Sequence, residues 1–428
     1  MGKALAINDV SLPPPPPAAC TDTASAALSD PSWCLTQALW QKCGTHFMRR
    51  GTCDLSCGRC DLLSARSQAM RRTLLVSARQ SSPCASSGAD AWVSRAMQNK
   101  ADYAQTHGMR FTWSSAVLDT RYDGAWNKVS YLKRMLSSML QERQNGQNGQ
   151  NGTAPQGRYD WLLWADWDVV FTDLAHTIPF DEYEARGARL VLGGDPDGIG
   201  GVGISASSDG SGDKAGAQSS ERKSDYLKIN SGVMAIRVHP WSLALLSRIL
   251  TSGGRTPQAR RRRAVEIQSV VANLCMGCID DQAALLELLH REGQRWRAHT
   301  VLERRYFLQG FWEDFATHLP EAPHLGLLAR RLDETLPLRQ PGSPPLAPLR
   351  QRVHGGTRVP LSIHFAGCQL CSGKATSKAA TCWPAFRRTL RFAEDQALRP
   401  LKLRHAQLNR SDEQNQPLET LEATGYRQ

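Results

Sequence analysis

Apolar and polar positions alternate in blocks along the chain after a cysteine-rich head. Thr73–Ser77, Met109–Ser114 and Tyr159–Phe171 are short apolar runs, which predict three strands. Between them, Ala91–His107 and Asn127–Gln141 carry apolar residues at helical spacing, which predicts two helices. Because the order is βαβαβ, we expect an α/β fold with a parallel sheet that has helices on its faces.

Four later segments also have the pattern of regular elements. Leu227–Val238 predicts a strand, and Trp241–Leu250 predicts a helix. Asp280–His290 predicts a helix that two acidic residues open, and Leu361–Phe365 predicts a short strand. The α/β pattern therefore continues through most of the chain.

Four polar segments fall outside this pattern. Residues 1–19 are a Pro-rich leader, and residues 400–428 form a polar tail. Residues 144–152 (QNGQNGQNG) and 205–224 are rich in Gly, Ser, Asn and Gln. We expect the leader to be disordered and the two internal segments to be disordered surface insertions that lengthen loops.

Length and composition exclude several classes of protein. At about 150 residues per domain, 428 residues suffice for two or three domains. Apolar residues at 41% and charged residues at 21% exclude wholesale disorder, collagen-like repeats and a multi-span membrane protein. We find no run of roughly 18 apolar residues and no apolar signal-peptide core near the start. Either the natural start is missing or the protein is soluble.

The net charge of +12 would suit nucleic acid, an acidic surface or a phosphate-bearing substrate. Much of the excess lies in runs such as residues 260–263 and in the set Arg350, Arg352 and Arg358, beside Pro, Gly and Gln. We expect these to be solvated loops. No Lys/Arg stripe is interleaved with aromatic residues, so we expect no nucleic-acid partner.

Half of the twelve cysteines lie in a short N-terminal stretch that contains few aliphatic residues. Hydrophobic burial alone would not fold it, whereas disulfides would stabilise it by about 2–4 kcal/mol each in an oxidising compartment. Zinc is the alternative, but only Cys57 and Cys60 have CxxC spacing, so disulfides are favoured. Spacing alone does not choose the pairing of these residues, which are Cys20, Cys34, Cys43, Cys53, Cys57 and Cys60.

The same stretch contains Cys20-Thr-Asp22, Trp33-Cys34, Cys43, Met48, Cys53 and Ser56-Cys57-Gly58-Arg59-Cys60. Over roughly residues 20 to 60 it resembles an ShK-toxin-like (ShKT) domain. The resemblance implies a small disulfide-rich module with the pairs Cys20–Cys60, Cys34–Cys53 and Cys43–Cys57. It also implies that the module contacts a protein partner. The long gap between Cys20 and Cys34 departs from the family pattern.

The apolar strand expected within Tyr159–Phe171 carries two carboxylates at its end. Asp166 and Asp168 are one residue apart, and ligands of parallel sheets lie beyond the carboxyl ends of strands. Two such carboxylates can hold one Mg²⁺ or Mn²⁺ and leave coordination positions for diphosphate oxygens. The alternative is a turn with solvated acids. By itself, Asp-x-Asp does not distinguish the two.

His364 is a candidate for a third metal ligand. It lies in Ser362-Ile-His364-Phe-Ala-Gly367-Cys368, after a short apolar strand and before a glycine that lets backbone approach a phosphate. The alternative is a hydrogen-bonded core histidine, which is the more common role for a lone histidine in this position.

Seven segments occur in a fixed order from about residue 72 to 395. Together they resemble glycosyltransferase family 34, which includes plant xyloglucan xylosyltransferases and fungal galactosyl- and mannosyltransferases. The resemblance implies a GT-A fold, which is a Rossmann-like α/β nucleotide-sugar transferase domain. The segments are Asn99-Lys100-Ala-Asp102-Tyr103 with His107-Gly108; Trp126-Asn-Lys128; Trp164-Ala-Asp166-Trp-Asp168 through Phe171-Thr-Asp173; Asn230-Ser-Gly232 through Arg237 and Trp241-Ser242; Asp280-Asp281-Gln282; Tyr306 with Gly310-Phe-Trp312; and His364-Phe-Ala-Gly367-Cys368.

The family resemblance further implies an activity. The enzyme would move galactose or xylose from a UDP-sugar to a glycan or glycoprotein acceptor, with Mn²⁺ and with retention of configuration, in the Golgi or the lumen of the secretory pathway. The implied metal ligands are Asp166, Asp168 and His364. The implied donor-binding residues are Asp166, Asn230, Gly232, Gly367 and, near a donor phosphate, Lys128. The implied catalytic residues, facing the transferred sugar and the attacking hydroxyl, are Asp280, Asp281 and Gln282.

Each of these segments also has a plain structural interpretation. Asn230-Ser-Gly232 could form a turn, Asp280-Asp281 could favour a helix N-terminus, and Lys128 could be a solvated helix residue. Retention leaves two mechanisms open. Asp281 is a candidate nucleophile for double displacement, whereas front-face attack, which we favour, needs only positioning, with Gln282 holding the sugar.

Three features depart from the family pattern, and one of them is the presence of the insertions at 144–152 and 205–224. Gln369 stands where plant members usually have Lys, so a positive contact to the diphosphate is missing unless Lys374 replaces it. Trp167 stands between the two acids where a small residue is usual. A catalytically decayed, glycan-binding adhesion protein is therefore the alternative function.

Two other classes of enzyme also carry ShKT modules. A zinc protease is excluded because the chain lacks His-Glu-x-x-His. A prolyl hydroxylase is not supported because we see no His-x-Asp with a distant His in a barrel-like run of strands.

The remaining six cysteines allow two interpretations. The pairs Cys275/Cys278 and Cys368/Cys371 have the spacing of a four-cysteine zinc site. Disulfides, including mixed pairs with Cys84 and Cys382, are favoured beside an oxidising head. The sequence does not determine the partners.

Overall fold

The structure is a computed structural model that describes residues 60–398 with gaps, the longest at 149–158, 201–222, 320–359 and 373–378. The predicted leader, residues 20–59 of the ShKT-like module with its three predicted disulfides, and the polar tail lie outside the described residues. So do most of the 205–224 insertion, as well as Cys275, Cys278 and Lys374.

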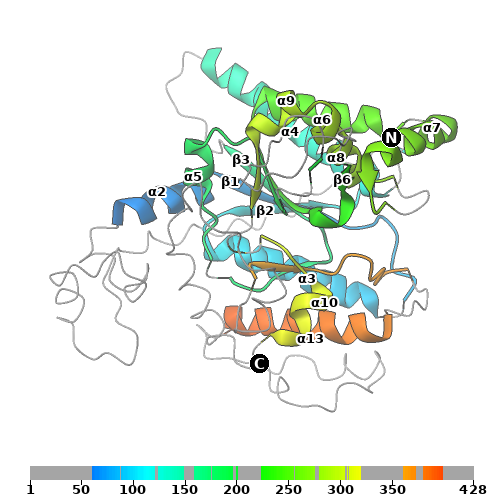
Figure 1. The fold of residues 1–428 in the computed structure, drawn as a ribbon. Helices are drawn as coiled ribbons and strands as arrows, with labels where there is room; N and C mark the ends of the chain where they lie inside the picture. Colours follow the sequence, from blue (N-terminus) through cyan, green and yellow to red (C-terminus); the bar gives the residue numbers. More distant parts are fainter. Residues whose placement is uncertain are drawn as a thin grey trace, which may run out of the picture.

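A six-stranded sheet forms the centre of the molecule, and its first three strands are parallel as predicted (Figure 1). The fourth strand in the order runs antiparallel to both of its neighbours, so the sheet is mixed rather than wholly parallel. In spatial order the strands are β2 (Arg110–Ser114), β1 (Thr73–Ala78), β3 (Trp161–Ala165), β7 (Ile229–Arg237), β5 (Leu190–Gly194) and β9 (Thr300–Glu303).

Both faces of this sheet are covered, which explains why β3 is apolar without alternation. All five residues of β3 are buried. Trp161 and Leu163 point into one hydrophobic cluster, whereas Leu162 and Trp164 point into another on the opposite face. A central strand that is buried on both faces is an uninterrupted apolar run. The predicted α/β fold is confirmed by this arrangement.

Helices form a layer on each side of the sheet (Figure 1). One cluster buries apolar residues of α4 (Gly124–Asn148), α6 (Pro240–Ser252), α7 (Pro257–Val270) and α8 (Asp281–Arg291) against the sheet. On the other side are α2 (Cys60–Arg71), α3 (Ala89–Thr106) and α5 (Phe180–Ala185). The shorter elements near these layers are β6 (Ser224–Asp225), η3 (Tyr226–Lys228), β8 (Val271–Ala272), α9 (Gly293–Trp296) and η4 (Arg297–His299).

A second, three-stranded sheet with the order β10-β11-β4 lies beyond the main one. Figure 1 shows α3 between the main sheet and α13 (Ala379–Leu398), with α10 (Trp312–Phe315) beside α13. A third hydrophobic cluster joins this sheet to α10 and α13. The strands are β10 (Gly310–Phe311), β11 (Ser362–His364) and β4 (Val169–Phe171), and η5 (Ala316–His318) follows α10.

Three predictions about individual elements are wrong in their details. The single strand expected over Tyr159–Phe171 is two strands, β3 and β4, in different sheets, because a tight turn separates them. The helix expected to end at Gln141 continues to Asn148, so the first residues of the 144–152 insertion are helical. Residues 260–263 lie in α7 and not in a loop. Thr256 caps that helix by accepting from the Ala259 amide, and Pro257 opens it.

Two disulfides cross-link the segment after β11, one to a distant part of the chain and one to the helix that follows. Cys84 pairs with Cys371, and Cys368 pairs with Cys382 in α13. Because Cys368 and Cys371 are both cross-linked, they do not form half of a zinc site. Among the described residues, no helix has the length and apolar character that crossing a membrane requires.

Candidate functional site

The two aspartates lie on a tight turn at the carboxyl end of β3. The amide of Val169 donates to the carbonyl of Asp166 at 3.1 Å, which closes the turn. The amide of Asp166 donates to the carbonyl of Gly232 at 2.8 Å, which ties the start of the turn to β7. The amide of Phe365 donates to the carbonyl of Asp168 at 3.0 Å. Hydrogen bonds to two other strands therefore fix the backbone of both aspartates.

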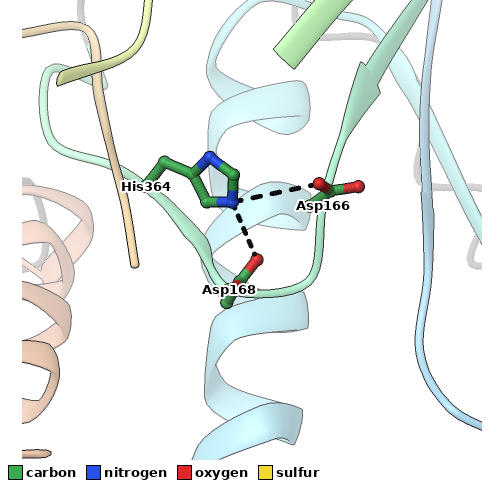
Figure 2. Close-up of side chains that lie close together, drawn as sticks. All are labelled: Asp166, Asp168 and His364. Atoms are coloured by element: carbon green, nitrogen blue, oxygen red, sulfur yellow. Dashed lines mark ion pairs between the residues drawn. The ribbon is translucent and has the colours of Figure 1, made fainter. Parts of the chain in front are cut away.

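Strand pairing brings His364 to these aspartates from far along the chain. β11 runs antiparallel to β4, and His364 is paired with Val169, the residue after Asp168. Figure 2 shows the His364 ring pointing at both carboxylates. Its Nε2 lies 3.3 Å from Asp168 Oδ1 and 3.9 Å from Asp166 Oδ2. One potential ligand atom from each residue lies within 4.8 Å of the other two.

A hydrogen bond on the other ring nitrogen orients the imidazole. His364 Nδ1 lies 3.1 Å from Asn230 Oδ1, which also accepts from the Gly232 amide at 2.7 Å. Asn230 Oδ1 is an acceptor, so we assign the Nδ1 proton to this bond, and Nε2 then faces Asp166 and Asp168. Metal-binding histidines are usually held in this way through the nitrogen that does not bind metal.

The electrostatics of the site favour a charged imidazole when no cation is bound. Burial alone would lower the pKa of His364, but the carboxylates of Asp168 and Asp166 outweigh it and raise the pKa above its ordinary value. Burial alone would raise the pKa of Asp168, but His364 and Lys100 outweigh it and lower the pKa. A bound cation would therefore replace a proton on His364.

The two oxygens of Asp166 have different surroundings. Oδ1 accepts a hydrogen bond from Trp164 Nε1 at 2.7 Å and lies 3.5 Å from Lys128 Nζ. Oδ2 is the oxygen that faces His364. The indole and the ammonium thus fix the carboxylate so that its second oxygen points at the candidate metal position.

Gly232 allows the imidazole to come this close. A Cβ on this residue would overlap Nδ1 and Cε1 of the His364 ring and would lie 2.9 Å from Asn230 Oδ1. The absence of a side chain is therefore a condition for the position of His364.

A buried polar group adjoins the aspartates on the side of α8. Lys128 Nζ lies 2.8 Å from Asp281 Oδ2 and 3.3 Å from the carbonyl of Ser231. The hydroxyl of Ser231 donates to Asp281 Oδ2 at 2.9 Å, and its amide donates to Gln282 Oε1 at 2.9 Å. Gln282 Nε2 donates to the carbonyl of Tyr226 at 3.0 Å. Ser231 thus links Lys128, Asp281 and Gln282.

Burial and charge pairing have opposing effects on the pKa values of this group. Burial alone would lower the pKa of Lys128, but Asp166 and Asp281 raise it above its ordinary value. Burial raises the pKa of Asp281, although Lys128 opposes the change. Because only 7% of Lys128 is exposed, it is a buried counter-ion and not the solvated helix residue of the plain interpretation.

Asp280 stabilises a helix N-terminus, which is the plain structural interpretation given for it above. It caps α8 by accepting from the Ala283 amide at 2.8 Å, and it also accepts from the hydroxyl of Tyr226. Burial and the neighbouring Asp281 raise its pKa. Asp280 is therefore connected to the site by its hydrogen bond with Tyr226 and by its electrostatic interactions with Asp281 and Lys128.

The segment after His364 contains Gly367, the last predicted donor-binding residue, and Gln369, one of the departures from the family pattern. Gly367 has φ of 80°, a left-handed conformation that favours glycine, and it is exposed. Gln369 is also exposed, with φ of 47°. The other departure, Trp167, packs its ring against Phe386 of α13 at 6.4 Å between centroids. Its bulk is accommodated in the third cluster.

The sequence interpretation assigned no role to three residues that organise the site. Ser231 and Trp164 make the contacts described above. Lys100 is fully buried in α3, and burial lowers its pKa to about 7, although Asp168 and Asp166 oppose the change. All three lie within the segments quoted above for the family resemblance, which was the only signal for them.

The residues fit a divalent cation. Two carboxylate oxygens and one imidazole nitrogen converge, and these are ligands that Mn²⁺ and Mg²⁺ accept. The imidazole is oriented by Asn230 and one carboxylate by Trp164, as expected for the outer contacts of a metal site. Three protein ligands would leave coordination positions for a substrate.

Comparison with known proteins finds similarity to glycosyltransferases. Residues 69–139 match the profile of the galactosyl transferase GMA12/MNN10 family. The chain is 26% identical over 337 residues to "Probable glycosyltransferase 3" of Oryza sativa subsp. japonica, covering 79% of this chain and 59% of that protein. It is 27% identical over 352 residues to "Glycosyltransferase 6" of Arabidopsis thaliana, covering 79% of this chain and 72% of that protein. The match thus spans 59% of the length of the rice relative.

A solved structure is also similar. It is the crystal structure of a glycosyltransferase involved in the glycosylation of the major capsid of PBCV-1, with 12% identity and a TM-score of 0.34, covering 73% of this chain and 98% of that chain. The sequence similarities support a glycosyltransferase function.

Proposed function

We propose that the chain is a member of glycosyltransferase family 34 with a GT-A fold, and that it moves galactose or xylose from a UDP-sugar to a glycan or glycoprotein acceptor. The reaction depends on Mn²⁺ and retains the configuration of the sugar. The observation that carries the proposal is the convergence of Asp166, Asp168 and His364 from segments almost 200 residues apart. The matching family profile and the plant relatives support it.

Asp166, Asp168 and His364 hold the metal, and the donor diphosphate binds beside them. When bound there, Mn²⁺ would neutralise the charge of the diphosphate and the further charge that develops as the diphosphate leaves the sugar. Asn230 orients His364, and Gly232 leaves room for it. The exposed, left-handed backbone at Gly367 contributes to the donor site because it offers no side chain to block a phosphate.

Retention proceeds by front-face attack. Asp281 Oδ2 is paired with Lys128 and accepts from Ser231, so that oxygen is poorly suited to act as a free nucleophile. In the front-face reaction the bond from the anomeric carbon to the phosphate oxygen breaks and the bond to the acceptor oxygen forms. The acceptor proton passes to the leaving diphosphate. Asp281 and Gln282 position the sugar, and Lys128 places positive charge at the donor side of the site.

The decayed, glycan-binding alternative has less support. A decayed site would be expected to lose part of its ligand set, whereas all three ligands and the contacts that orient them are present. Trp167, one of the two departures that suggested decay, packs away from the ligands. Calorimetry with UDP and Mn²⁺ separates the two functions, because a decayed site would show no metal-dependent nucleotide binding.

The enzyme acts in the Golgi or the lumen of the secretory pathway, and an ShKT module over residues 20–60 contacts a protein partner. Two disulfides in the transferase domain support an oxidising compartment. The domain organisation proposed is the module followed by a transferase domain over residues 72–395.

The test is turnover of UDP-sugars by the purified chain. The wild-type protein should transfer or hydrolyse a UDP-sugar only when Mn²⁺ is present, and Asp168→Ala should lower turnover by about 10³-fold or more while the circular dichroism spectrum is unchanged. Equal turnover in the variant would refute the proposal. A screen of UDP- and GDP-sugars then identifies the donor.

A further inference from the structure

Lys100 is a buried lysine that no proposed step of the reaction uses. It lies on α3 and has 0% exposure. Its Nζ donates to the carbonyls of Ala96 at 3.2 Å, Trp167 at 3.1 Å and Val169 at 2.6 Å. In its protonated form Lys100 has three hydrogens to donate, and these three carbonyls use all of them. Two of the three acceptors flank Asp168.

These contacts hold the peptide groups next to Asp168. The carbonyl of Trp167 lies in the same rigid plane as the amide of Asp168, so Lys100 fixes the orientation of that peptide. The peptide on the other side is fixed by Phe365, whose amide donates to the carbonyl of Asp168. Because both planes are held, the direction in which the Cα–Cβ bond of Asp168 leaves the backbone is set.

The neighbouring residue holds the strand that follows. Asn99 Nδ2 donates to the carbonyl of Phe171 at 3.0 Å, and Asn99 Oδ1 accepts from the amide of Phe171 at 2.8 Å. Consecutive residues of α3 therefore fasten the segment from Trp167 to Phe171, while β11 pairs with β4 and supplies His364.

We propose that Lys100 is a positioning residue of the metal site, which aims Asp168 at the space shared with Asp166 and His364. This inference rests on the proposed function where metal affinity is concerned. A role as a positive charge and a role in positioning predict opposite changes in cation affinity when the side chain of Lys100 is replaced by an uncharged one. If Lys100 acted only as a positive charge near two carboxylates, its loss would strengthen binding of a cation. Because it positions Asp168, its loss weakens that binding.

The experiment compares Lys100→Met with the wild-type full chain in two measurements. Hydrogen–deuterium exchange of the metal-free proteins should be about tenfold faster or more in the variant over residues 166–171. The dissociation constant for Mn²⁺ alone, measured by electron paramagnetic resonance of the free ion, should rise about tenfold. Lys100→Gln, which keeps a neutral donor, should recover part of both effects.

Tyr103→Phe is the matched control. Tyr103 also lies on α3 and donates a buried hydrogen bond, to the carbonyl of His176 at 2.9 Å, away from the turn. It should leave exchange over residues 166–171 and Mn²⁺ affinity unchanged.

Unchanged exchange over residues 166–171 in Lys100→Met, or tighter Mn²⁺ binding, would overturn the role proposed for Lys100. If Lys100→Met does not fold, Lys100→Gln decides by the same criteria. Absence of Mn²⁺ affinity in the wild-type protein would contradict the proposed function instead, and the exchange measurement would still decide whether Lys100 holds the turn.

Discussion

Two clusters of charged side chains lie on this fold, and their charge balance differs. The first is the metal site, where Asp166, Asp168 and His364 converge. The second, which we call the arginine–glutamate cluster, lines a cavity of about 220 Å³ between α6, α7 and α8. The charged residues of the second cluster are Arg248, Arg263, Arg291, Glu266, Glu287 and Glu292.

Every glutamate of the arginine–glutamate cluster has an arginine partner. Glu287 pairs with Arg263 and, at 3.2 Å, with Arg291. Glu292 pairs with Arg248 at 2.8 Å, and Glu266 pairs with Arg263. The cluster has equal numbers of each charge, so it has little attraction for a free ion. A concentration of charge on helices is by itself no sign of a binding site.

At the metal site, by contrast, one oxygen of each of two carboxylates faces the same imidazole nitrogen, Nε2 of His364, which can carry only one proton. Asp166 and Asp168 direct these oxygens at the same space, and rigid strand ends hold both. The difference shows that carboxylate oxygens converging with an imidazole nitrogen at strand ends indicate a candidate site, whereas glutamates that are each paired with an arginine do not.

Among the variants that distinguish the metal site from the arginine–glutamate cluster, Gly232→Ala is expected to have the largest effect on metal binding and turnover. The added Cβ would overlap the His364 ring and displace the third ligand. Mn²⁺ affinity and turnover should both fall, on the order of 10²-fold. Isothermal titration with Mn²⁺ and UDP measures the first, and a UDP-release assay measures the second.

Gly193→Ala is the control for this substitution. Its Cβ would make ordinary contacts with Gln309 and Leu308, at 3.5 and 3.9 Å. This variant should keep wild-type affinity and turnover. Normal Mn²⁺ affinity in Gly232→Ala would show that His364 does not need its present position.

The next effect is the pH dependence of metal binding. The pKa of His364 is raised above its ordinary 6.5, chiefly by Asp168 and against the effect of burial. Below the raised pKa a proton occupies Nε2, so Mn²⁺ affinity should fall by about tenfold for each pH unit of acidification. The decline should begin above pH 6.5 and not below it. Affinity that is constant across this range would contradict the assignment of His364.

The ionic link between α4 and α8 should affect stability. Lys128→Met leaves Asp281 buried, with 5% exposure and without its counter-ion at 2.8 Å. The free energy of unfolding should fall by about 3–5 kcal/mol, because a buried charge loses its partner. Urea denaturation measures the loss. In the double variant Lys128→Met with Asp281→Asn, part of the lost free energy of unfolding should be recovered.

The smallest effect on activity is expected in the arginine–glutamate cluster. Glu287→Gln removes the charge that pairs with Arg263 and Arg291. Stability should fall by about 1–3 kcal/mol, and turnover should be unchanged within error. A large loss of turnover at unchanged stability would mean that the cluster takes part in function.

The sequence predicted the fold class and the elements because hydrophobic periodicity reports burial on one or both faces. β1, β7 and α6 have nearly the expected bounds. It did not predict that β3 and β4 belong to different sheets. Apolar residues continue on both sides of Asp166, and only the backbone turn and the pairing with β11 reveal the break.

The same limit applies to the site. Asp-x-Asp could be found from local spacing, whereas the meeting of His364 with it depends on the register of β11 against β4. The links through Ser231 and Lys100 could not be predicted, because a serine or a lysine has no sequence pattern that reports which carbonyl or carboxylate it reaches. The pairing Cys84–Cys371 joins residues 287 apart and likewise follows only from the fold.

The central claim is that two aspartates and a distant histidine bind one cation jointly for a nucleotide diphosphate. Calorimetric binding of UDP to the wild-type chain and to His364→Ala, each with and without Mn²⁺, tests it most directly. The account predicts that Mn²⁺ tightens UDP binding in the wild type by about tenfold or more and has no such effect in His364→Ala. Equal UDP affinity with and without Mn²⁺ in the wild type, or an undiminished effect of Mn²⁺ in the variant, would contradict it.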